Sequence, residues 1–396
     1  MEELEQKPKK DYLLIKLLLG IAIGIVIGII CNEAVINVIQ SIKYVLNQVI
    51  SFMVPLIVLG FIAPAITRMG NRANKMLGVI LALAYFSSVG AALMASIAGY
   101  AIIPNLNIAS KVAGGKELPE LIFKLDINPV FPVITALFLA ICGGVAVVKT
   151  KSKYFENLLE ELNNIILFLV NNVVVPVLPF YIGSTFATLA YEGTIIKSVP
   201  VFLIIILIAI VGHFIWLTIL YTIAGIVSKK NPARVFKHYG PAYFTAVGTM
   251  SSAATLPVAL KCASKSDALD KDVVNFAIPM GATIHLCGSV LTETFFVMTI
   301  SKILYGSLPS VGTMILFIIL LGVFAVGAPG VPGGTVVASL GIIISVLGFD
   351  NDGTALILAI FALQDSFGTA CNVTGDGALA LILQGIFKKD KQNQNS

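Results

Sequence analysis

Long apolar blocks, and not an alternation of apolar and polar positions, dominate this chain. Several blocks reach the roughly 20 residues that a helix needs to cross a bilayer. Only helices and closed barrels satisfy the backbone in lipid, and these blocks lack the period-two pattern of a barrel strand. The pattern predicts an all-α integral membrane protein, with first-half spans at 13–30, 36–66, 76–103, 128–148, 157–190 and 198–227.

Four stretches of polar and helix-breaking residues interrupt the apolar segments of the second half. They predict, in order, a serine-tipped hairpin, an interrupted helix, a Gly/Pro-tipped hairpin and a second interrupted helix. Such pairs are typical of secondary transporters, where non-helical backbone at membrane depth is buried in protein or lines a cavity. Ordinary loops are the alternative interpretation. The stretches are 240–257, 279–289, 327–334 and 364–376.

The composition agrees with a membrane protein. The 396 residues are 57% hydrophobic and 12% charged, with a mean hydropathy of +0.95, whereas soluble proteins carry about 25% charged residues. The acidic start, Met1–Glu5, and the lack of a small-residue cleavage site favour a first span over a signal peptide. The five cysteines form no CxxC motif, so we expect neither a disulfide framework nor a metal centre.

Basic residues gather in short connections and near both ends of the chain, whose net charge is +5. The positive-inside rule places these connections and both termini in the cytoplasm, and the loop 104–127 outside. Each basic cluster is small and abuts a span, which argues against a nucleic-acid-binding surface. The basic segments are 7–10, 68–75, 149–153, 229–237 and 388–391.

Asp365, Thr369, Asn372 and Asp376 are spaced to fall within about 60° of one helix face. Carboxylates inside a membrane are costly and usually face a site or pathway. With no basic residue nearby in sequence, these two need protonation or a cation, such as an ammonium group or a metal ion. A polar stripe that joins helices is the alternative. The set favours a site for a zwitterion beside an ion, and amino acids are the obvious zwitterions.

The three arginines, Arg68, Arg72 and Arg234, all lie in basic connections. None is available in the core of the second half to clamp a side-chain carboxylate with two hydrogen bonds. This distribution argues against aspartate or glutamate as the substrate.

Two further ionisable residues lie inside apolar segments. His285, at a predicted helix break, is either a satisfied hydrogen-bonding group or a proton-sensitive one. Glu293 is either a coupling carboxylate or a buried protonated one. The sequence leaves both pairs of roles open.

Four motifs of the second half, in the correct order, resemble the dicarboxylate/amino acid:cation symporters, the glutamate-transporter family. The likeness is good over 240–387, and the first half agrees in its number of spans and in Ser87-Ser88. The motifs are SSAATLP (251–257) at the first hairpin tip, HLCGS (285–289) at the family's Asn-Met-Asp-Gly-Thr position, GVPG (330–333) at the second hairpin tip and NVTGD (372–376) in the last helix.

The resemblance implies eight transmembrane helices, two re-entrant helical hairpins, broken helices at the substrate site, a homotrimer and an elevator-type mechanism. Scaffold helices 1–2 and 4–5 would lie in 12–66 and 128–192. The moving transport domain would contain helix 3 at 74–103 and the segment 198–387. That segment would hold helix 6, hairpin 1 at about 240–262, helix 7, hairpin 2 at about 311–345 and helix 8.

The resemblance also implies roles for single residues. Asp365 would hold the substrate amine, while Asn372 and Thr369 would meet the carboxylate and a polar side chain. Ser252 would contribute from the first hairpin. The implied substrate-binding residues are Asp365, Thr369, Asn372, Ser252, Gly368, Val331 and Gly333.

Sodium is the implied coupling ion. One ion would lie at Asp376, Asn372 and His285, and a second at Thr283 and carbonyl groups of the second hairpin. Glu293 falls where animal members of the family carry a glutamate linked to proton and potassium coupling.

The chain departs from the family at four positions. Gly368 replaces the last-helix arginine of members with acidic substrates, and Met250 replaces the first-hairpin arginine of some prokaryotic members. His285 and Cys287 replace the Asn and Asp of the helix-break motif. Because that Asp helps to form a third sodium site, we expect only one or two sodium sites here.

The sequence therefore predicts a sodium-coupled symporter of a small neutral amino acid (serine, threonine or alanine), similar to the sodium/serine–threonine branch. We expect a multi-pass protein of a prokaryotic-type plasma membrane, and no enzyme. A proton-coupled carrier of the same fold, using His285 or Glu293, is the first alternative. An ion channel or a ligand sensor on this scaffold is the second. No phosphate-binding glycine loop suggests an ATP-driven motor.

Overall fold

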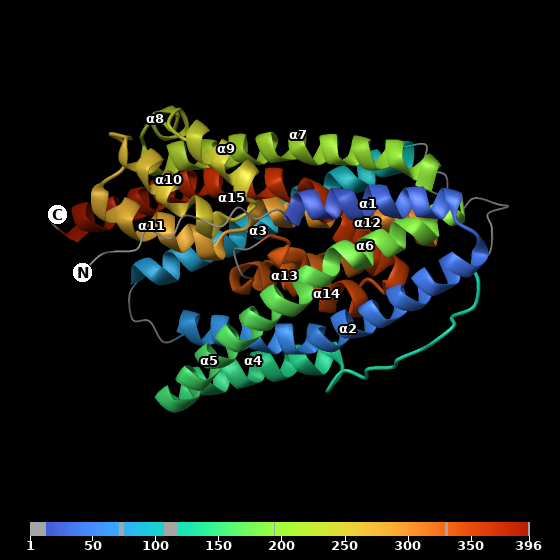
Figure 1. Ribbon diagram of the computed structural model, residues 1–396. Helices are drawn as coiled ribbons and strands as arrows, with labels where there is room; N and C mark the ends of the chain where they lie inside the picture. The colour runs from blue at the N-terminus through green and yellow to red at the C-terminus, as the bar shows by residue number, and fades with distance from the viewer. Residues whose placement is uncertain (1–12, 71–74, 107–117, 194, 329–331, 395–396) are drawn as a thin grey trace, which may run out of the picture.

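The computed structural model describes residues 13–70, 75–106, 118–193, 195–328 and 332–394. Within these ranges all regular structure is helical (Figure 1). Among the described residues, six helical segments are long and apolar enough to cross a membrane. The prediction of an all-α membrane protein is confirmed.

The first half follows the predicted spans. The span expected at 157–190 is one helical rod whose middle, Val170–Val174, is a π turn. After the short turn Ile103–Asn105, the described part of the predicted loop contains no helix. The helices are α1 (Leu13–Ile30), α2 (Glu33–Gly70), α3 (Lys75–Ile102), α4 (Val133–Thr150), α5 (Lys153–Leu169), α6 (Val175–Tyr191) and α7 (Ile195–Ser228).

The second half contains shorter helices around one long one. A short helix leads from α7 into the first hairpin, and two hairpins alternate with α11–α12 and α15. The helices are α8 (Ala233–Phe236), α9 (Gly240–Thr249), α10 (Ser252–Ser264), α11 (Lys271–Ile284), α12 (Cys287–Tyr305), α13 (Val311–Gly327), α14 (Gly334–Ser345) and α15 (Asn351–Gln394).

The first hairpin turns within two residues. Met250 ends α9 in the left-handed conformation, with φ of 53°. Ser251 is extended, and its Oγ accepts the N–H of Ala254 at 3.2 Å, which caps α10. The hydroxyl groups of Thr249 and Thr255 lie 2.9 Å apart across the turn. The serine-rich motif therefore forms the tip that was predicted.

Two of the remaining three interruptions also occur. His285 and Leu286 are non-helical and separate α11 from α12. The helices α13 and α14 form the second hairpin, and its tip residues 329–331, including Val331, lie outside the described residues.

The interruption predicted at 364–376 is wrong, because α15 runs unbroken through these residues. In the apolar window of this helix, 89% of the residues are buried inside the protein. Three of its polar side chains, Asp365, Asn372 and Asp376, find hydrogen-bond partners outside α15 while the backbone stays helical.

Two sets of helix–helix contacts hold the bundle together. Glycines bring α1 against α6: a Cβ on Gly24 would lie 2.1 Å from the carbonyl oxygen of Gly183. Small residues allow such backbone contact between membrane helices. In the other half, α15 runs beside α7 and is also packed against α9, α11 and α12 (Figure 1). This central helix carries the polar row predicted from the sequence.

Candidate functional site

All four members of the predicted row on α15 are buried: Asp365, Thr369, Asn372 and Asp376 are at most 4% exposed. Asp365 contacts the second hairpin, since its Oδ2 accepts the N–H of Gly333 at 2.7 Å. Gly333 has φ of +69°, a conformation that favours glycine, at the start of α14. The predicted substrate residues Asp365 and Gly333 are therefore brought together.

Asn372 connects α15 to the first turn of α12. Its Oδ1 accepts the N–H groups of Gly288 at 2.7 Å and Ser289 at 3.3 Å. Its Nδ2 donates to Ser289 Oγ at 2.9 Å. The first N–H groups of a helix have no partner within that helix. Asn372 thus caps α12 from another helix and fixes the helix break against α15.

His285 lies in the break and bridges two helices. Its Nδ1 is 2.9 Å from Asp376 Oδ1, and its Nε2 is 2.9 Å from Ser87 Oγ on α3. A carboxylate only accepts, so Nδ1 carries a hydrogen, and in the neutral ring Nε2 accepts the Ser87 hydroxyl. The predicted partners His285 and Asp376 are brought together, with Ser87 as a third member.

The second oxygen of Asp376, Oδ2, is buried and has no hydrogen-bond partner among the described residues. A buried carboxylate oxygen without a partner is costly. Oxygen donors are the ligands that hard cations prefer. The Asp376 carboxylate thus has one oxygen held by His285 and one free to meet a cation.

Glycines allow the backbones to approach closely around this site. A Cβ on Gly281 would lie 2.5 Å from Asp376 Oδ1, and a Cβ on Gly288 would lie 2.5 Å from the carbonyl oxygen of Gly368. A Cβ on Gly368 would touch Ser289 at 3.4 Å. The site is therefore a packed junction of α11, α12 and α15.

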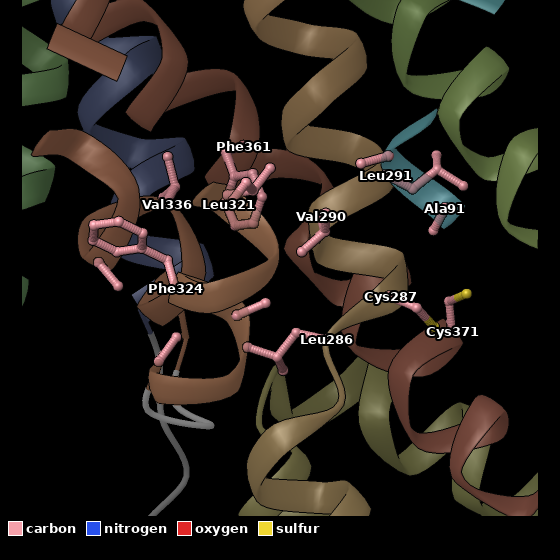
Figure 2. Packing of buried hydrophobic residues seen from close by; sticks show 14 of the residues in the cluster. Ala91, Leu286, Cys287, Val290, Leu291, Leu321, Phe324, Val336, Phe361 and Cys371 are labelled. Carbon is pink, nitrogen blue, oxygen red and sulfur yellow. The ribbon is translucent and has the colours of Figure 1, made fainter. Parts of the chain in front are cut away.

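Cys287 opens α12 and lies beside Cys371 of α15, both as free thiols (Figure 2). No group of three His, Cys, Asp or Glu side chains that could hold a metal ion was found in the described part of the chain. The junction thus offers oxygen atoms to a hard cation and no cluster typical of a transition metal.

A comparison with known proteins decides the family. The model of the sodium:dicarboxylate symporter family matches residues 13–386, nearly the whole chain. The chain belongs to this family. The resemblance inferred from the four motifs is confirmed, and with it the elevator-type fold class.

The chain is similar to excitatory amino acid transporters. It is 31% identical to rabbit (Oryctolagus cuniculus) transporter 3 over 204 residues, covering 52% of this chain and 38% of the relative. It is 28% identical to human transporter 1 over 244 residues, covering 61% of this chain and 44% of the relative. It is 34% identical to mouse transporter 3 over 170 residues, covering 43% and 32%. The chain spans less than half of the length of these relatives.

The other predicted site residues of this family member occupy different surroundings. Glu293 is fully buried in α12, and its Oε1 accepts the hydroxyl of Ser339 on the second hairpin. Ser252 is buried at the start of α10. Thr283 is exposed, and its hydroxyl donates to the carbonyl of Met280 in its own helix at 2.8 Å. None of the hydrogen bonds described for Thr283 reaches another helix.

Sequence reasoning missed His213, which lies 2% exposed in α7 and contacts the start of α12. The available signal was an ionisable residue in the middle of the apolar block 198–227. Ser289, the partner of Asn372, was noted only as a position within a motif.

Proposed function

We propose that the protein is a secondary symporter that couples uptake of a small neutral amino acid, such as serine, threonine or alanine, to inward sodium flux. The observation that carries this proposal is the pair of buried carboxylates, Asp365 and Asp376, on one face of α15. Asp365 contacts a backbone N–H and Asp376 a histidine. An ammonium group at Asp365 and a sodium ion at Asp376 would neutralise the charges of the two carboxylates.

A neutral substrate is supported by the distribution of arginine. The family description names dicarboxylates, and the relatives are named for excitatory amino acids. This chain has Gly368 where we expect acidic-substrate members to carry arginine, and its three arginines lie elsewhere in the sequence. From these sequence positions we expect no guanidinium group to pair with a second carboxylate of the substrate.

We propose that Asp365 holds the amine, and that Asn372, Thr369 and Ser252 meet the carboxylate and the side chain. Asn372 already donates its amide to Ser289, so this role requires that bond to be exchanged or shared when the substrate binds. Gly368, Val331 and Gly333 would line the same space. Because Gly333 donates to Asp365, substrate entry would compete with the hairpin for this carboxylate.

One or two sodium ions would accompany the substrate. Asp376 Oδ2 and Asn372, beside His285, would form one site, and Thr283 with hairpin carbonyls the other. Cys287 argues against a third site, since it stands where the resemblance to the family implies an aspartate. The free Asp376 oxygen supports the first of these sites.

The architecture we propose follows the family. Scaffold helices would lie in 12–66 and 128–192, and the transport domain in 74–103 and 198–387. Lys43 and Asp352, 2.6 Å apart, would then form an ion pair between the two domains. We further propose a homotrimer in a prokaryotic-type plasma membrane with both termini cytoplasmic, as the basic connections favour.

A proton-coupled carrier of the same fold is the second candidate. The observation that favours it is that the two ionisable groups His285 and Glu293 are both fully buried and both bonded to other helices. Protons would then replace sodium as the coupling ion.

Uptake of radiolabelled serine into sealed proteoliposomes tests the proposal. We expect accumulation with an inward sodium gradient, little with choline in place of sodium, and no competition by aspartate. Accumulation driven only by a proton gradient would establish the second candidate. Passive flux of many ions would indicate a channel, and binding without accumulation a sensor. Failure of serine and of a neutral amino-acid panel would overturn the substrate assignment.

A further inference from the structure

His213 lies in the middle of α7, a helix outside the junction of α11, α12 and α15 described above. Its side chain is 2% exposed. An ionisable residue inside a membrane span is expensive to bury, so its partners identify its role. α7 runs beside α15, the helix that carries the polar row (Figure 1).

The hydrogen bonds of His213 define the state of its ring. Its Nε2 is 3.1 Å from the carbonyl oxygen of Gly288 and 2.9 Å from Thr292 Oγ1, both in α12. A carbonyl only accepts, so Nε2 carries the hydrogen. Gln364 Nε2 of α15 lies 3.4 Å from Nδ1 and 3.5 Å from Nε2. Because Nε2 of the neutral ring carries the hydrogen, only Nδ1 can accept from this amide. The chain from Gln364 through His213 to Gly288 joins α15, α7 and α12.

This series of hydrogen bonds ends on Gly288, the same residue that Asn372 contacts. The N–H of Gly288 donates to Asn372 Oδ1 at 2.7 Å, while its carbonyl accepts from His213. Gly288 is also in backbone contact with α15, because a Cβ there would lie 2.5 Å from the Gly368 carbonyl oxygen. The first turn of α12 is therefore fixed from two helices at once.

At its other end the series stops at Gln364, whose neighbour in sequence, Asp365, contacts the second hairpin. His213 thus connects the part of α15 that carries Asp365 with the first turn of α12, which also contacts Asn372. These two places correspond to the amine end and the carboxylate end of the substrate in the proposed function.

We propose that His213 is a positioning residue: it sets the spacing between Asp365 and the start of α12, and so the fit of the substrate. This inference rests on the proposed function, because its test measures substrate affinity, and its structural basis is the set of His213 hydrogen bonds. In this role His213 would affect substrate affinity through α12 and α15.

Substitution with leucine and glutamine tests the role. His213→Leu keeps an apolar filling but loses all three contacts, whereas His213→Gln keeps a donor and an acceptor. We expect His213→Leu to raise the half-saturating serine concentration about tenfold, with the maximal rate per folded protein within about twofold of wild type. His213→Gln should have a half-saturating serine concentration within about threefold of the wild-type value. Thr218→Val is the matched control, since Thr218 is exposed on α7 and donates only to its own helix.

An unchanged half-saturating concentration in His213→Leu, with only less folded protein or a lower maximal rate, would overturn the positioning role. It would leave His213 as a structural residue. Equal affinity loss in the leucine and glutamine variants would likewise overturn the role of the hydrogen bonds.

A second measurement is independent of transport. Nitrogen-15 NMR of histidine-labelled protein in lipid should show His213 with a protonated Nε2 and a bare Nδ1, assigned by comparison with His213→Gln. Gln364→Leu should shift the Nδ1 resonance. A ring protonated at Nδ1 would overturn the inference. If the wild type accumulates no amino acid, the proposed function fails, while the NMR result still decides whether the chain from Gln364 to Gly288 exists.

Discussion

The rod Lys153–Tyr191 and the helix α15 are both long enough to cross a membrane, yet their surroundings differ. In the apolar window of the rod 33% of the residues are buried and the mean hydropathy is 2.2, whereas the values for Asn351–Phe387 are 89% and 1.4. The more polar helix is thus the more enclosed one. Polar groups are tolerated at membrane depth where protein, and not lipid, surrounds them.

The two regions also hold their helices together differently. The contact between α1 and α6 consists of glycines and small residues that let backbones touch, as at Gly24 and Gly183. The contact between α12 and α15 adds hydrogen bonds, as at Asn372 and Ser289. Changes in the first region should therefore affect stability, and changes in the second should affect ligands as well.

The largest effect is expected from Asp365→Asn. The amide keeps the shape of the side chain but loses the charge that we propose holds the amine. Losing a charge-assisted contact of about 3 kcal/mol lowers substrate affinity about 100-fold. Equilibrium binding and uptake measure this change. Asp267→Asn is the control, because Asp267 is exposed and pairs with Arg234 at 3.2 Å, away from the polar row of α15. Wild-type affinity in Asp365→Asn would rule out the amine role.

A smaller effect is expected from His285→Phe, which leaves the buried Asp376 and Ser87 without their shared partner. An unsatisfied buried group costs about 2 kcal/mol. The thermal midpoint in detergent should fall, and the sodium concentration for half-maximal uptake should change. His285→Asn, which can still donate to Asp376, should be intermediate. If His285→Phe has both wild-type stability and wild-type sodium dependence, the bridge has no role.

Gly24→Ala should affect only the first region. The new methyl group would lie 2.1 Å from the Gly183 carbonyl oxygen, so α1 must shift away from α6. Overpacking of this kind costs about 1–2 kcal/mol. We expect a lower thermal midpoint with unchanged affinity for substrate and sodium. Gly143→Ala is matched to it, since a Cβ at Gly143 meets nothing within 4 Å; equal behaviour of the two variants would contradict the packing argument.

The smallest effect is expected from Lys43→Gln, at the ion pair between α2 and α15. Lys43 is 10% exposed in its side chain and Asp352 is 53% exposed, so solvent weakens their pairing. The pair should contribute about 0.5–1 kcal/mol and less at high salt. Thermal unfolding at low and high salt measures this contribution. Combining Lys43→Asp with Asp352→Lys should restore part of it, and a wild type without salt dependence would argue against the pair.

The helix break and the first hairpin tip could be predicted because their signals are local. The serine-rich turn at Ser251 and the non-helical pair His285-Leu286 both follow from residues within a few positions. The same reasoning failed for 364–376, where polar residues and glycines suggested a break in α15. The helix persists there because Asn372 and Asp376 are paired with α12 and His285, which a local pattern cannot reveal.

The sequence by itself determined the membrane class, the spans, the family motifs, the row on one face of α15 and the positions of its three arginines. Hydropathy and helical spacing are properties of neighbouring residues, so they can be read along the chain. Only the tertiary structure decided which groups meet: Ser87 with His285, 198 positions apart, and His213 with Thr292, 79 positions apart. These partners depend on how whole helices pack, because hydrogen-bonding groups satisfy one another across helices that no local pattern brings into register.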